Sequence, residues 1–402
     1  MPIRIMVATS AQELDDVYKL RHQVYVKTEG YFKNMAGKHI IDHFDTFPYV
    51  ANIIAYSDNT PVGTFRISLD TPVLLPADEL FNFGAYRERV NEEVQRERQQ
   101  SAIIVSAGML AIAKSWRNRR DVFYALFKIA YNVGKLWKAT HIIATANVKS
   151  ATIYKKLGFE VLGEQFWVPS IGESVIPVGC DLTLLDNWAF GVFSGENTEL
   201  IENFSGSFQY LLMSANSMVF RKGDDGNEAY LIERGNVKIT QPDPISHQEL
   251  GLITLQQGDL FGELSLIDGQ PRSANARIIG NTELIVLSRD DFWKKIHQEP
   301  YKVNTLLKIF CKRIRDIDDR AFLYAHGSLA ERLKHFINKV QDCAIPVSKK
   351  DETYVAKIST EEFSYMASVS LEEAESYFAN LQQNKRIKIS PKEIIFYGNQ
   401  PI

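Results

Sequence analysis

One stretch, residues 261–274, constrains this 402-residue chain more than any other part of the sequence. It reads Phe-Gly-Glu-Leu-Ser-Leu-Ile-Asp-Gly-Gln-Pro-Arg-Ser-Ala, and its residue types suit an anionic sugar ligand. Arg272 offers a planar guanidinium that can donate two parallel hydrogen bonds to a phosphate, and Ser273 adds a hydroxyl beside it. Gly262 lets the backbone approach a ligand closely, and Glu263 is an acceptor suited to a ribose hydroxyl. A lone Arg and Glu in a loop would instead be a solvated pair of little energetic value.

This stretch resembles the phosphate-binding cassette of cyclic nucleotide-binding domains, which occur in protein kinase regulatory subunits, gated channels and bacterial catabolite activators. The resemblance covers about residues 200–325 and includes the β-roll pattern before the cassette. It implies that Glu263 holds the ribose and that Arg272 and Ser273 hold the cyclic phosphate.

The same resemblance assigns further residues of the nucleotide site. Gly262 and Leu264 accompany Glu263 in the cassette, and the helix that follows the roll places Asp318 near the base. We expect cyclic AMP as the effector because Ser follows Arg in the cassette, as in the bacterial activators. Cyclic GMP stays open as an alternative, since an aspartate can accept hydrogen bonds from either purine.

A basic loop lies in the first half of the chain, where residues 110–122 run from an apolar strand into a helix. A strand-to-helix loop presents free backbone amides and the positive end of a helix, where a pyrophosphate can bind. Arg117, Arg119 and Arg120 would add positive charge there. On its own, such a cluster is more often a solvated face.

The segment 147–159 follows the apolar strand 141–144 and contains Asn147 and then Tyr-Lys-Lys-Leu-Gly-Phe. This order resembles the second signature of GNAT-type N-acyltransferases. Arg117 fits their first signature, in which Arg120 and Val122 here replace two small residues. The resemblance implies that a pantetheine thioester, acyl-coenzyme A or acyl carrier protein, binds at Leu110, Ile112, Arg117, Arg119, Arg120 and Asn147.

The same resemblance implies a mechanism. A backbone amide of the strand around residues 110–112 holds the thioester carbonyl, and Tyr154 protonates the leaving thiolate. The alternative for Tyr154 is simple packing of its ring.

Residues 5–185 as a whole resemble the acyl-homoserine-lactone synthases and N-acyl amino acid synthases, which are GNAT-fold enzymes that take acyl groups from acyl carrier protein. Arg21, Asp42, Asp45 and Arg66 fall on the patterned positions of that family. The resemblance implies that the two arginines position the substrate. Asp42, Asp45 or a water would remove a proton from the incoming amine, unless the two aspartates only cap a loop.

One departure from this family limits the reaction. The lactone synthases carry a Glu and an Arg on the strand before the acyl loop, where this chain has Ser106 and Met109. We therefore do not expect lactone synthesis.

The C-terminal segment 358–375 has the spacing of a helix-turn-helix, and with residues 387–397 as a wing it resembles the output domain of catabolite-activator-type regulators. DNA readers need basic or amide side chains at the start of the second helix. Residues 370–384 carry three glutamates and no basic residue. We therefore expect a lid, a spacer or a partner surface rather than a DNA reader.

These patterns predict an α+β multidomain protein. We expect a GNAT-like α/β sheet domain (1–188), a linker (189–203), a β-roll or jelly-roll nucleotide domain with a long C-terminal helix (204–325), and a small winged-helix domain (328–402). Apolar residues from 303 to 324 recur at intervals of four and three residues, as in a heptad repeat. This pattern favours either a homodimer through this helix or packing of the helix on the chain's own core.

Composition excludes several other classes of protein. Lys plus Arg number 46 and Asp plus Glu 49, so the near-neutral charge argues against a surface built for polyanions. The longest apolar runs fall far short of the ~18 residues of a membrane span, and three scattered cysteines form neither a disulfide framework nor a zinc site. We expect a cytoplasmic protein without a metal.

Three functions follow as hypotheses. The first is a cyclic-nucleotide-regulated N-acyltransferase that moves an acyl group from a pantetheine thioester to an amine. The second is a catabolite-activator-type transcription regulator whose first domain senses acyl thioesters without catalysis. The third is a non-catalytic scaffold that binds both ligands.

Overall fold

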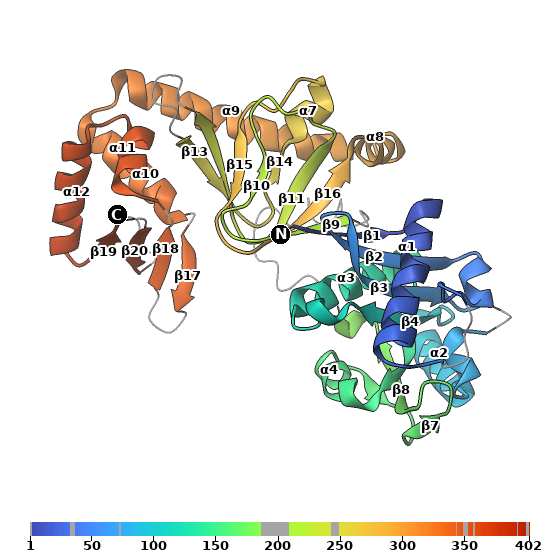
Figure 1. The fold of residues 1–402 in the computed structure, drawn as a ribbon. Helices are drawn as coiled ribbons and strands as arrows, with labels where there is room; N and C mark the ends of the chain where they lie inside the picture. The colour runs from blue at the N-terminus through green and yellow to red at the C-terminus, as the bar shows by residue number, and fades with distance from the viewer. Residues whose placement is uncertain are drawn as a thin grey trace. The chain divides into compact units, whose positions relative to one another are not determined.

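The computed structural model describes the whole chain except residues 1, 33–36, 72–73, 186–208, 243–248, 343, 349–352, 357, 392 and 399–401. The chain divides into two compact units, Met1–Thr198 with Glu202–Leu212, and Glu199–Ile201 with Met213–Ile402. Each unit mixes helices and strands, as Figure 1 shows by colour along the chain. This multidomain α+β architecture agrees with the predicted fold class.

The first unit is built on one twisted sheet in the order β9-β1-β2-β3-β4-β5-β8-β6, with β7 beside β8. All neighbours are antiparallel except β4 and β5, which are parallel. The strands are β1 (Ile3–Val7), β2 (Val50–Ser57), β3 (Thr60–Leu69), β4 (Ile104–Ile112), β5 (His141–Asn147), β6 (Glu160–Val161), β7 (Phe166–Val168), β8 (Glu173–Asp181) and β9 (Gln209–Met213).

Helices connect and cover these strands. They are α1 (Ala11–His22), the π-helical turns η1 (Gln23–Thr28), α2 (Gly84–Arg98), α3 (Arg120–Leu136) and α4 (Ala151–Lys156), with short 3₁₀ turns η2 (His43–Thr46), η3 (Pro76–Glu79), η4 (Lys114–Trp116) and η5 (Val148–Ser150). The apolar residues of α3 recur at intervals of four and three residues; Val122, Leu126, Ile129 and Val133 are buried, while Leu136 at the helix end is exposed.

Strands β4 and β5 separate partway along their length. They pair from Ile104 with His141 to Ser106 with Ile143, and beyond that point β4 pairs only with β3 within the described sheet. Thr64 lies opposite Ala111 and Arg66 opposite Gly108, so β4 contains one extra residue there. Met109, with a left-handed φ of 52°, marks this bulge. The result is an opening between the carboxyl halves of β4 and β5.

Strand β9 closes the sheet of the first unit at β1, with Ile3 opposite Leu212 and Met6 opposite Gln209. Tyr210 is buried, and its hydroxyl accepts a hydrogen bond of 3.0 Å from Asn132 of α3. Residues 209–212 were expected in the second domain, and the structure assigns them to the first unit because of this pairing. The predicted linker, 189–203, lies outside the described residues.

The second unit begins with a roll of short antiparallel strands in two sets, β14-β11-β16 and β10-β15-β12-β13. They are β10 (Met218–Phe220), β11 (Glu228–Arg234), β12 (Val237–Pro242), β13 (Glu249–Leu255), β14 (Leu260–Phe261), β15 (Asn275–Ile278) and β16 (Thr282–Ser288). The short helix α7 (Glu263–Asp268) lies between β14 and β15 in the chain. Helices α8 (Arg289–Gln298) and α9 (Lys302–His326) follow the roll.

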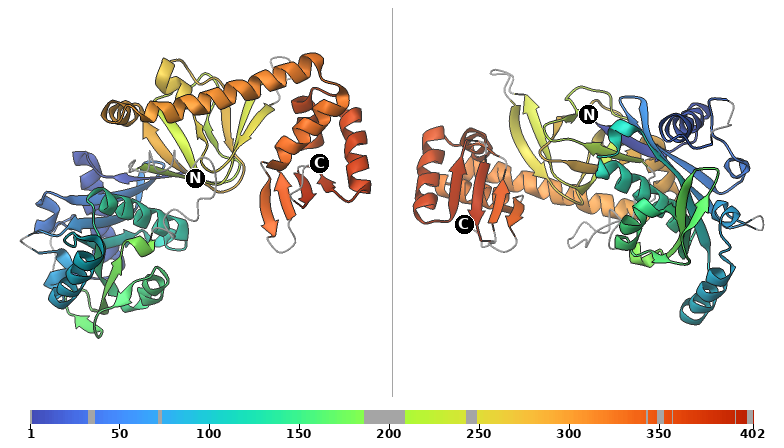
Figure 2. Two further views of the ribbon diagram at one scale, coloured as in Figure 1. Left: turned by 180° about the vertical axis from the view of Figure 1, so that it is seen from behind. Right: turned by 60° about the horizontal axis from the view of Figure 1, so that its bottom comes forward.

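The C-terminal part has its own core around Phe336, Phe363, Phe378 and Phe396. Its sheet has the order β17-β18-β20-β19, and Figure 2 shows it with its helices from two further sides. The elements are α10 (Leu329–Asp342), β17 (Ile345–Ser348), β18 (Thr353–Ala356), α11 (Thr360–Ala367), α12 (Leu371–Gln383), β19 (Ile387–Ser390) and β20 (Glu393–Tyr397). The two predicted helices and the predicted strand pair are therefore present.

In the described part of the chain, no helix has the length and apolar character to cross a membrane.

Candidate functional site

A cavity of about 500 Å³ lies between the roll of the second unit and helix α9. Its lining includes the five predicted cassette residues, which come from the β14–β15 segment: Gly262, Glu263, Leu264, Arg272 and Ser273. Helix α9 supplies the facing wall with Arg313, Asp316, Ile317, Arg320, Ala321 and Tyr324. The cassette is thus assembled on one side of a cavity large enough for a nucleotide.

The guanidinium of Arg272 is buried and held by main-chain carbonyls. Its Nη1 donates to the carbonyl of Gly262 and its Nη2 to that of Glu228, both at 2.7 Å. The centroid of the Phe220 ring lies 4.3 Å from the guanidinium carbon, and burial lowers the pKa of Arg272, although the group stays charged. Its Nε is buried without a hydrogen-bond partner among the described atoms. This orphaned charged donor fits an anionic ligand, because an unpaired buried donor is costly.

The backbone at Gly262 is fitted closely around that guanidinium. Gly262 has a left-handed φ of 74°, and a Cβ there would lie 2.7 Å from Nη1 of Arg272. Any larger residue would therefore displace Arg272.

The carboxylate of Glu263 is 2% exposed and forms an ion pair with Arg313 of α9. Arg313 also donates to the carbonyl of Leu260. Burial raises the pKa of Glu263, against the opposing effect of Arg313. The predicted ribose acceptor is thus tied directly to the helix that closes the cavity.

Asp318, which was expected near the base, is exposed and does not contribute to the cavity. Each helical residue turns the side chain by about 100°, so the face of α9 that carries Asp316, Ile317 and Arg320 excludes Asp318. The aspartate that lines the cavity is Asp316, whose carboxylate also accepts a hydrogen bond of 3.3 Å from Lys339 of α10.

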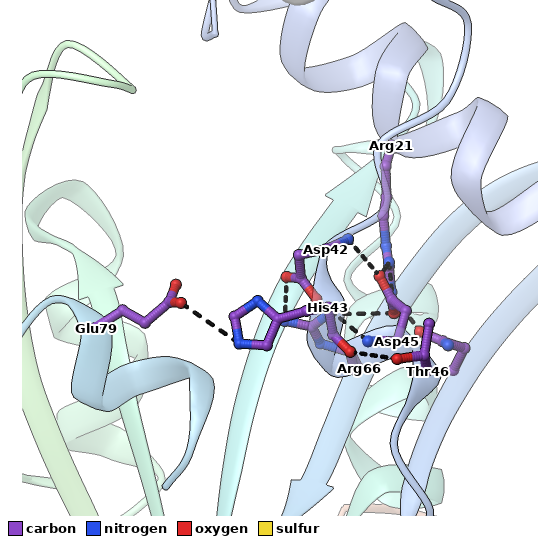
Figure 3. A network of polar contacts seen from close by, with 8 residues as sticks. Arg21, Asp42, His43, Asp45, Thr46, Arg66 and Glu79 are labelled. Carbon is purple, nitrogen blue, oxygen red and sulfur yellow. Dashed lines mark hydrogen bonds and ion pairs between the residues drawn. The ribbon is translucent and has the colours of Figure 1, made fainter. Parts of the chain in front are cut away.

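In the first unit, the four predicted residues Arg21, Asp42, Asp45 and Arg66 meet in one ion-pair network (Figure 3). Arg21 pairs with Asp45 at 3.1 Å, and Arg66 pairs with Asp42 at 2.6 Å and with Asp45 at 3.1 Å. The side chains of both arginines and of Asp45 are at most 2% exposed. Arg21 also donates to the side chain of Asn52.

The two aspartates also cap the short helix η2. Asp42 accepts from the amide of Asp45, and Asp45 accepts from the amide of Asp42, each at 3.2 Å. Burial acts to raise the pKa of Asp45, but Arg21, Arg66 and the backbone of Asp42 outweigh it and lower the pKa. Both aspartates therefore cap this loop in the structure, and a carboxylate held between two buried arginines is a weak proton acceptor.

The basic loop lies at the carboxyl end of β4, beside the opening. Arg117 donates from Nε to the carbonyl of Ile112 at 3.2 Å and pairs with Glu29 at 2.5 Å. Arg119 pairs with Asp121 at 2.6 Å, and Arg120 is exposed at the start of α3. Leu110 and Ile112 are half-buried on the edge of β4 that β5 leaves unpaired.

Asn147 lies at the carboxyl end of β5, on the other side of the opening. Its side-chain amide donates to Glu173, and its carbonyl accepts from the amide of Lys149 at 2.9 Å. Lys149 also pairs with Glu173 at 2.8 Å. The opening thus separates Arg117 at the end of one strand from Asn147 at the end of the next.

Three residues at this opening, Glu29, Tyr31 and Glu173, were not predicted. Glu29 and Tyr31 follow η1, and Glu173 is the first residue of β8; no motif of the acyltransferases marks them. The signal that the sequence offers is a glycine next to each glutamate, Gly30 and Gly172. Both glycines have a left-handed φ in the structure.

Tyr154 is buried and packs edge-on against Phe127 and Phe159. Burial raises the pKa of Tyr154 to about 12, so its phenol is protonated at neutral pH. The ring of Tyr154 therefore packs in the core, as the alternative interpretation expects. Its protonated hydroxyl is also in the state that a proton donor requires.

Comparisons with known proteins address both units. Residues 16–181 match the family of the N-acyl amino acid synthase FeeM, and residues 211–299 match the cyclic nucleotide-binding domain. The cyclic AMP receptor protein of Thermus thermophilus is 30% identical over 149 residues, which cover 37% of this chain and 68% of the receptor.

A CRP-like cAMP-activated global transcriptional regulator of Mycobacterium tuberculosis is 29% identical over 147 residues, covering 36% of this chain and 65% of the regulator. The chain therefore spans about two thirds of the length of both relatives. The solved structure of FeeM from uncultured soil microbes is 16% identical, with a TM-score of 0.36, and covers 46% of this chain and 93% of that one.

Two of the resemblances seen in the sequence, to the N-acyl amino acid synthases and to the cyclic nucleotide-binding domains, are thus confirmed, together with the expectation of an acyltransferase. The winged helix stays a prediction. The chain belongs to the cyclic AMP receptor protein family through its second unit, and its first unit is an acyltransferase domain of the N-acyl amino acid synthase FeeM family.

Proposed function

We propose that this protein is a cyclic-nucleotide-regulated N-acyltransferase of the cytoplasm. It moves an acyl group from a pantetheine thioester, acyl-coenzyme A or acyl carrier protein, to an amine. The observation that carries this proposal is the unpaired edge of β4, which opens toward β5 between Arg117 and Asn147 in a domain of the FeeM family.

The chemistry of the transfer follows from that edge. A backbone amide of β4 around Leu110–Ile112 binds the thioester carbonyl and stabilises the oxyanion as the amine attacks. Arg117, Arg119 and Arg120 bind the phosphates of the donor, and Tyr154 protonates the departing thiolate.

The buried network has a different role in this proposal from the one expected. Because Arg21 and Arg66 are enclosed and paired, they position the loop that contains η2 rather than touch the substrate. Asp42 and Asp45 complete that support, which leaves the proton acceptor to be found elsewhere.

The acceptor and the effector are proposed from the relatives. The name of the FeeM family favours an amino acid as the amine. The names of the two relatives favour cyclic AMP over cyclic GMP, with its phosphate at the orphaned Nε of Arg272 and its ribose at Glu263.

Regulation would act through α9. This helix lines the cavity with Asp316 and Tyr324, and the same two residues bond to Lys339 of α10 and to the carbonyl of Met366 in α11. A ligand shifts such an arrangement only by its differential affinity for two states. The α9 side chains Leu307, Ile314 and Ile317 are 52–62% exposed, which supports a homodimer through this helix.

The experiment measures free thiol released from a panel of acyl-coenzyme A and acyl carrier protein donors with amino acids, with and without saturating cyclic AMP or cyclic GMP. We expect release with at least one donor class and a change of about 5- to 150-fold with nucleotide. Absence of thiol release with every pair contradicts the transferase, and equal rates with and without nucleotide contradict the regulation.

A second candidate is a transcription regulator, which the names of the two relatives and the order α11, α12, β19, β20 favour. The start of α12 opposes it, because Glu372 and Glu373 lie in its first turn and would repel phosphates. A mobility-shift assay with genomic fragments separates the two, since the acyltransferase proposal expects no shifted band.

A further inference from the structure

A mixed-charge cluster joins the carboxyl ends of β4 and β5 across the opening. Glu29 pairs with Arg117, which follows β4. Glu173 accepts a hydrogen bond from Asn147, the last residue of β5, and pairs with Lys149 just beyond it. Tyr31 interacts electrostatically with both carboxylates and donates its hydroxyl to Glu173. Burial, Glu173 and Glu29 together raise the pKa of Tyr31 to about 12, so the phenol keeps its proton.

The two carboxylates face a cavity of about 830 Å³ that is separate from the buried network of Figure 3. Its walls are the loop after η1 and the turn between β7 and β8, which are joined by a hydrogen bond of 3.0 Å from the amide of Phe32 to the carbonyl of Ser170. Trp167, 61% exposed, adds an aromatic face. The side chains of Glu29 and Glu173 are 27% and 20% exposed, so both remain accessible to a ligand.

The ion pairs connect this cavity to the donor site. Arg117 is a proposed phosphate ligand, and in the structure its partner is Glu29. A phosphate competes strongly for a guanidinium, because it accepts two parallel charge-assisted hydrogen bonds. Donor binding would therefore release Glu29, whose described ion-pair partner is Arg117. Glu173 would stay fixed by Tyr31, Asn147 and Lys149.

We propose that Glu173 and Glu29 form the acceptor site of this transferase, for an ammonium group of an amino acid, and that Glu29 removes its proton after the donor takes Arg117. This inference rests on the proposed function. The ammonium gives one proton to Glu29, and the nitrogen lone pair forms the C–N bond at the thioester carbon. The C–S bond breaks with its electron pair on sulfur, Tyr154 gives its proton to the thiolate, and the second proton of the nitrogen restores the Tyr154 hydroxyl. The products are an amide, a free thiol and protonated Glu29.

The test uses the full-length protein and three variants, Glu29→Gln, Glu173→Gln and the control Glu160→Gln. Glu160 pairs with Arg89 at 2.5 Å on the same sheet but lies outside the cavity, so it controls for the loss of an exposed ion pair. Thiol release is measured over a range of pH and amine concentration. Binding of coenzyme A and of acyl carrier protein is measured by calorimetry.

Glu29→Gln is expected to lower kcat at pH 7 about 100-fold or more. The loss of kcat is expected to shrink as the pH rises toward the pKa of the amine, because the deprotonated amine needs no base. The same variant is expected to bind the donor about two- to fivefold more tightly, because Arg117 loses a competitor. Glu173→Gln is expected to raise the KM of the amine about tenfold or more with little change in donor affinity.

The results that would contradict the inference differ from those that would contradict the proposed function. A Glu29→Gln loss that is the same at every pH, or weaker donor binding, indicates a structural role and overturns the inference. An active wild type whose two cavity variants match Glu160→Gln overturns it as well, with the proposed function intact. A wild type that releases no thiol with any pair overturns the proposed function and the inference together.

Discussion

Replacement of Asp45 by Asn would test the buried network directly. The substitution keeps the shape but removes one negative charge, so Arg21 loses its carboxylate and Arg66 keeps only Asp42. Breaking a buried pair by removing one partner costs about 3–5 kcal/mol, because an uncompensated charge is left inside. The control Glu160→Gln breaks an ion pair whose side chains are 46–49% exposed, which is worth at most about 1 kcal/mol.

Hydrogen exchange read by mass spectrometry on peptides of β2 and β3 is the suitable assay, because it isolates the first unit within the whole chain. A cost of 3–5 kcal/mol accelerates exchange of the protected amides by about two to four powers of ten, and the control by less than one. Equal acceleration in both variants would refute the conclusion that the network supports the fold.

Comparison of the wild type with the Asp45→Asn variant also tests a prediction about pH. The pKa of folded Asp45 lies below its unfolded value of about 3.9, so its stabilisation is complete above about pH 5. That contribution is lost as the pH falls through 3.9 toward the folded pKa. The Asn variant lacks this part of the acid destabilisation, and an identical pH dependence of exchange in both proteins would contradict the assignment.

Three further predictions concern the ligands and the assembly. Arg272→Leu removes the buried guanidinium from the nucleotide cavity and is expected to weaken cyclic AMP binding at least about 10- to 150-fold by calorimetry; retained affinity would contradict the cassette. The double variant Leu307→Glu, Ile314→Glu places charge on the exposed apolar face of α9 and is expected to convert dimers to monomers in sedimentation velocity. A wild type that is already monomeric would refute the homodimer through α9. Arg117→Glu repels the donor phosphates and is expected to lower the affinity for coenzyme A about tenfold or more. An unchanged affinity would contradict a role of Arg117 in donor binding.

Local patterns in the sequence predicted much of the fold. The change from strand to helix over residues 110–122 and the β-roll pattern before the cassette depend on neighbours in the chain, and the structure places both as expected. The cassette was equally visible, because Gly262, Glu263 and Arg272 lie within a few residues of one another.

The rest depends on tertiary geometry. Asp318 and Asp316 differ by two positions on one helix, and only the orientation of α9 against the roll decides which of them lines the cavity. Glu29 and Glu173 lie 144 residues apart in sequence and meet through Tyr31, so no local pattern joins them. Asp42, Asp45, Arg21 and Arg66 stand at positions that the resemblance marks, but only the structure shows that the two aspartates are paired with the two arginines.

The return of β9 to β1 has a consequence for how this protein is made. Ile3 and Ile5 are fully buried, and the outer edge of β1 is covered by residues 209–212, about 200 positions later. While the chain emerges from the ribosome, that edge has no partner until β9 has been synthesised. A chain truncated after residue 188 would keep β1 as a bare, apolar edge strand, which invites pairing with other copies. Isolating the acyltransferase domain in soluble form therefore requires the chain to continue through Met213.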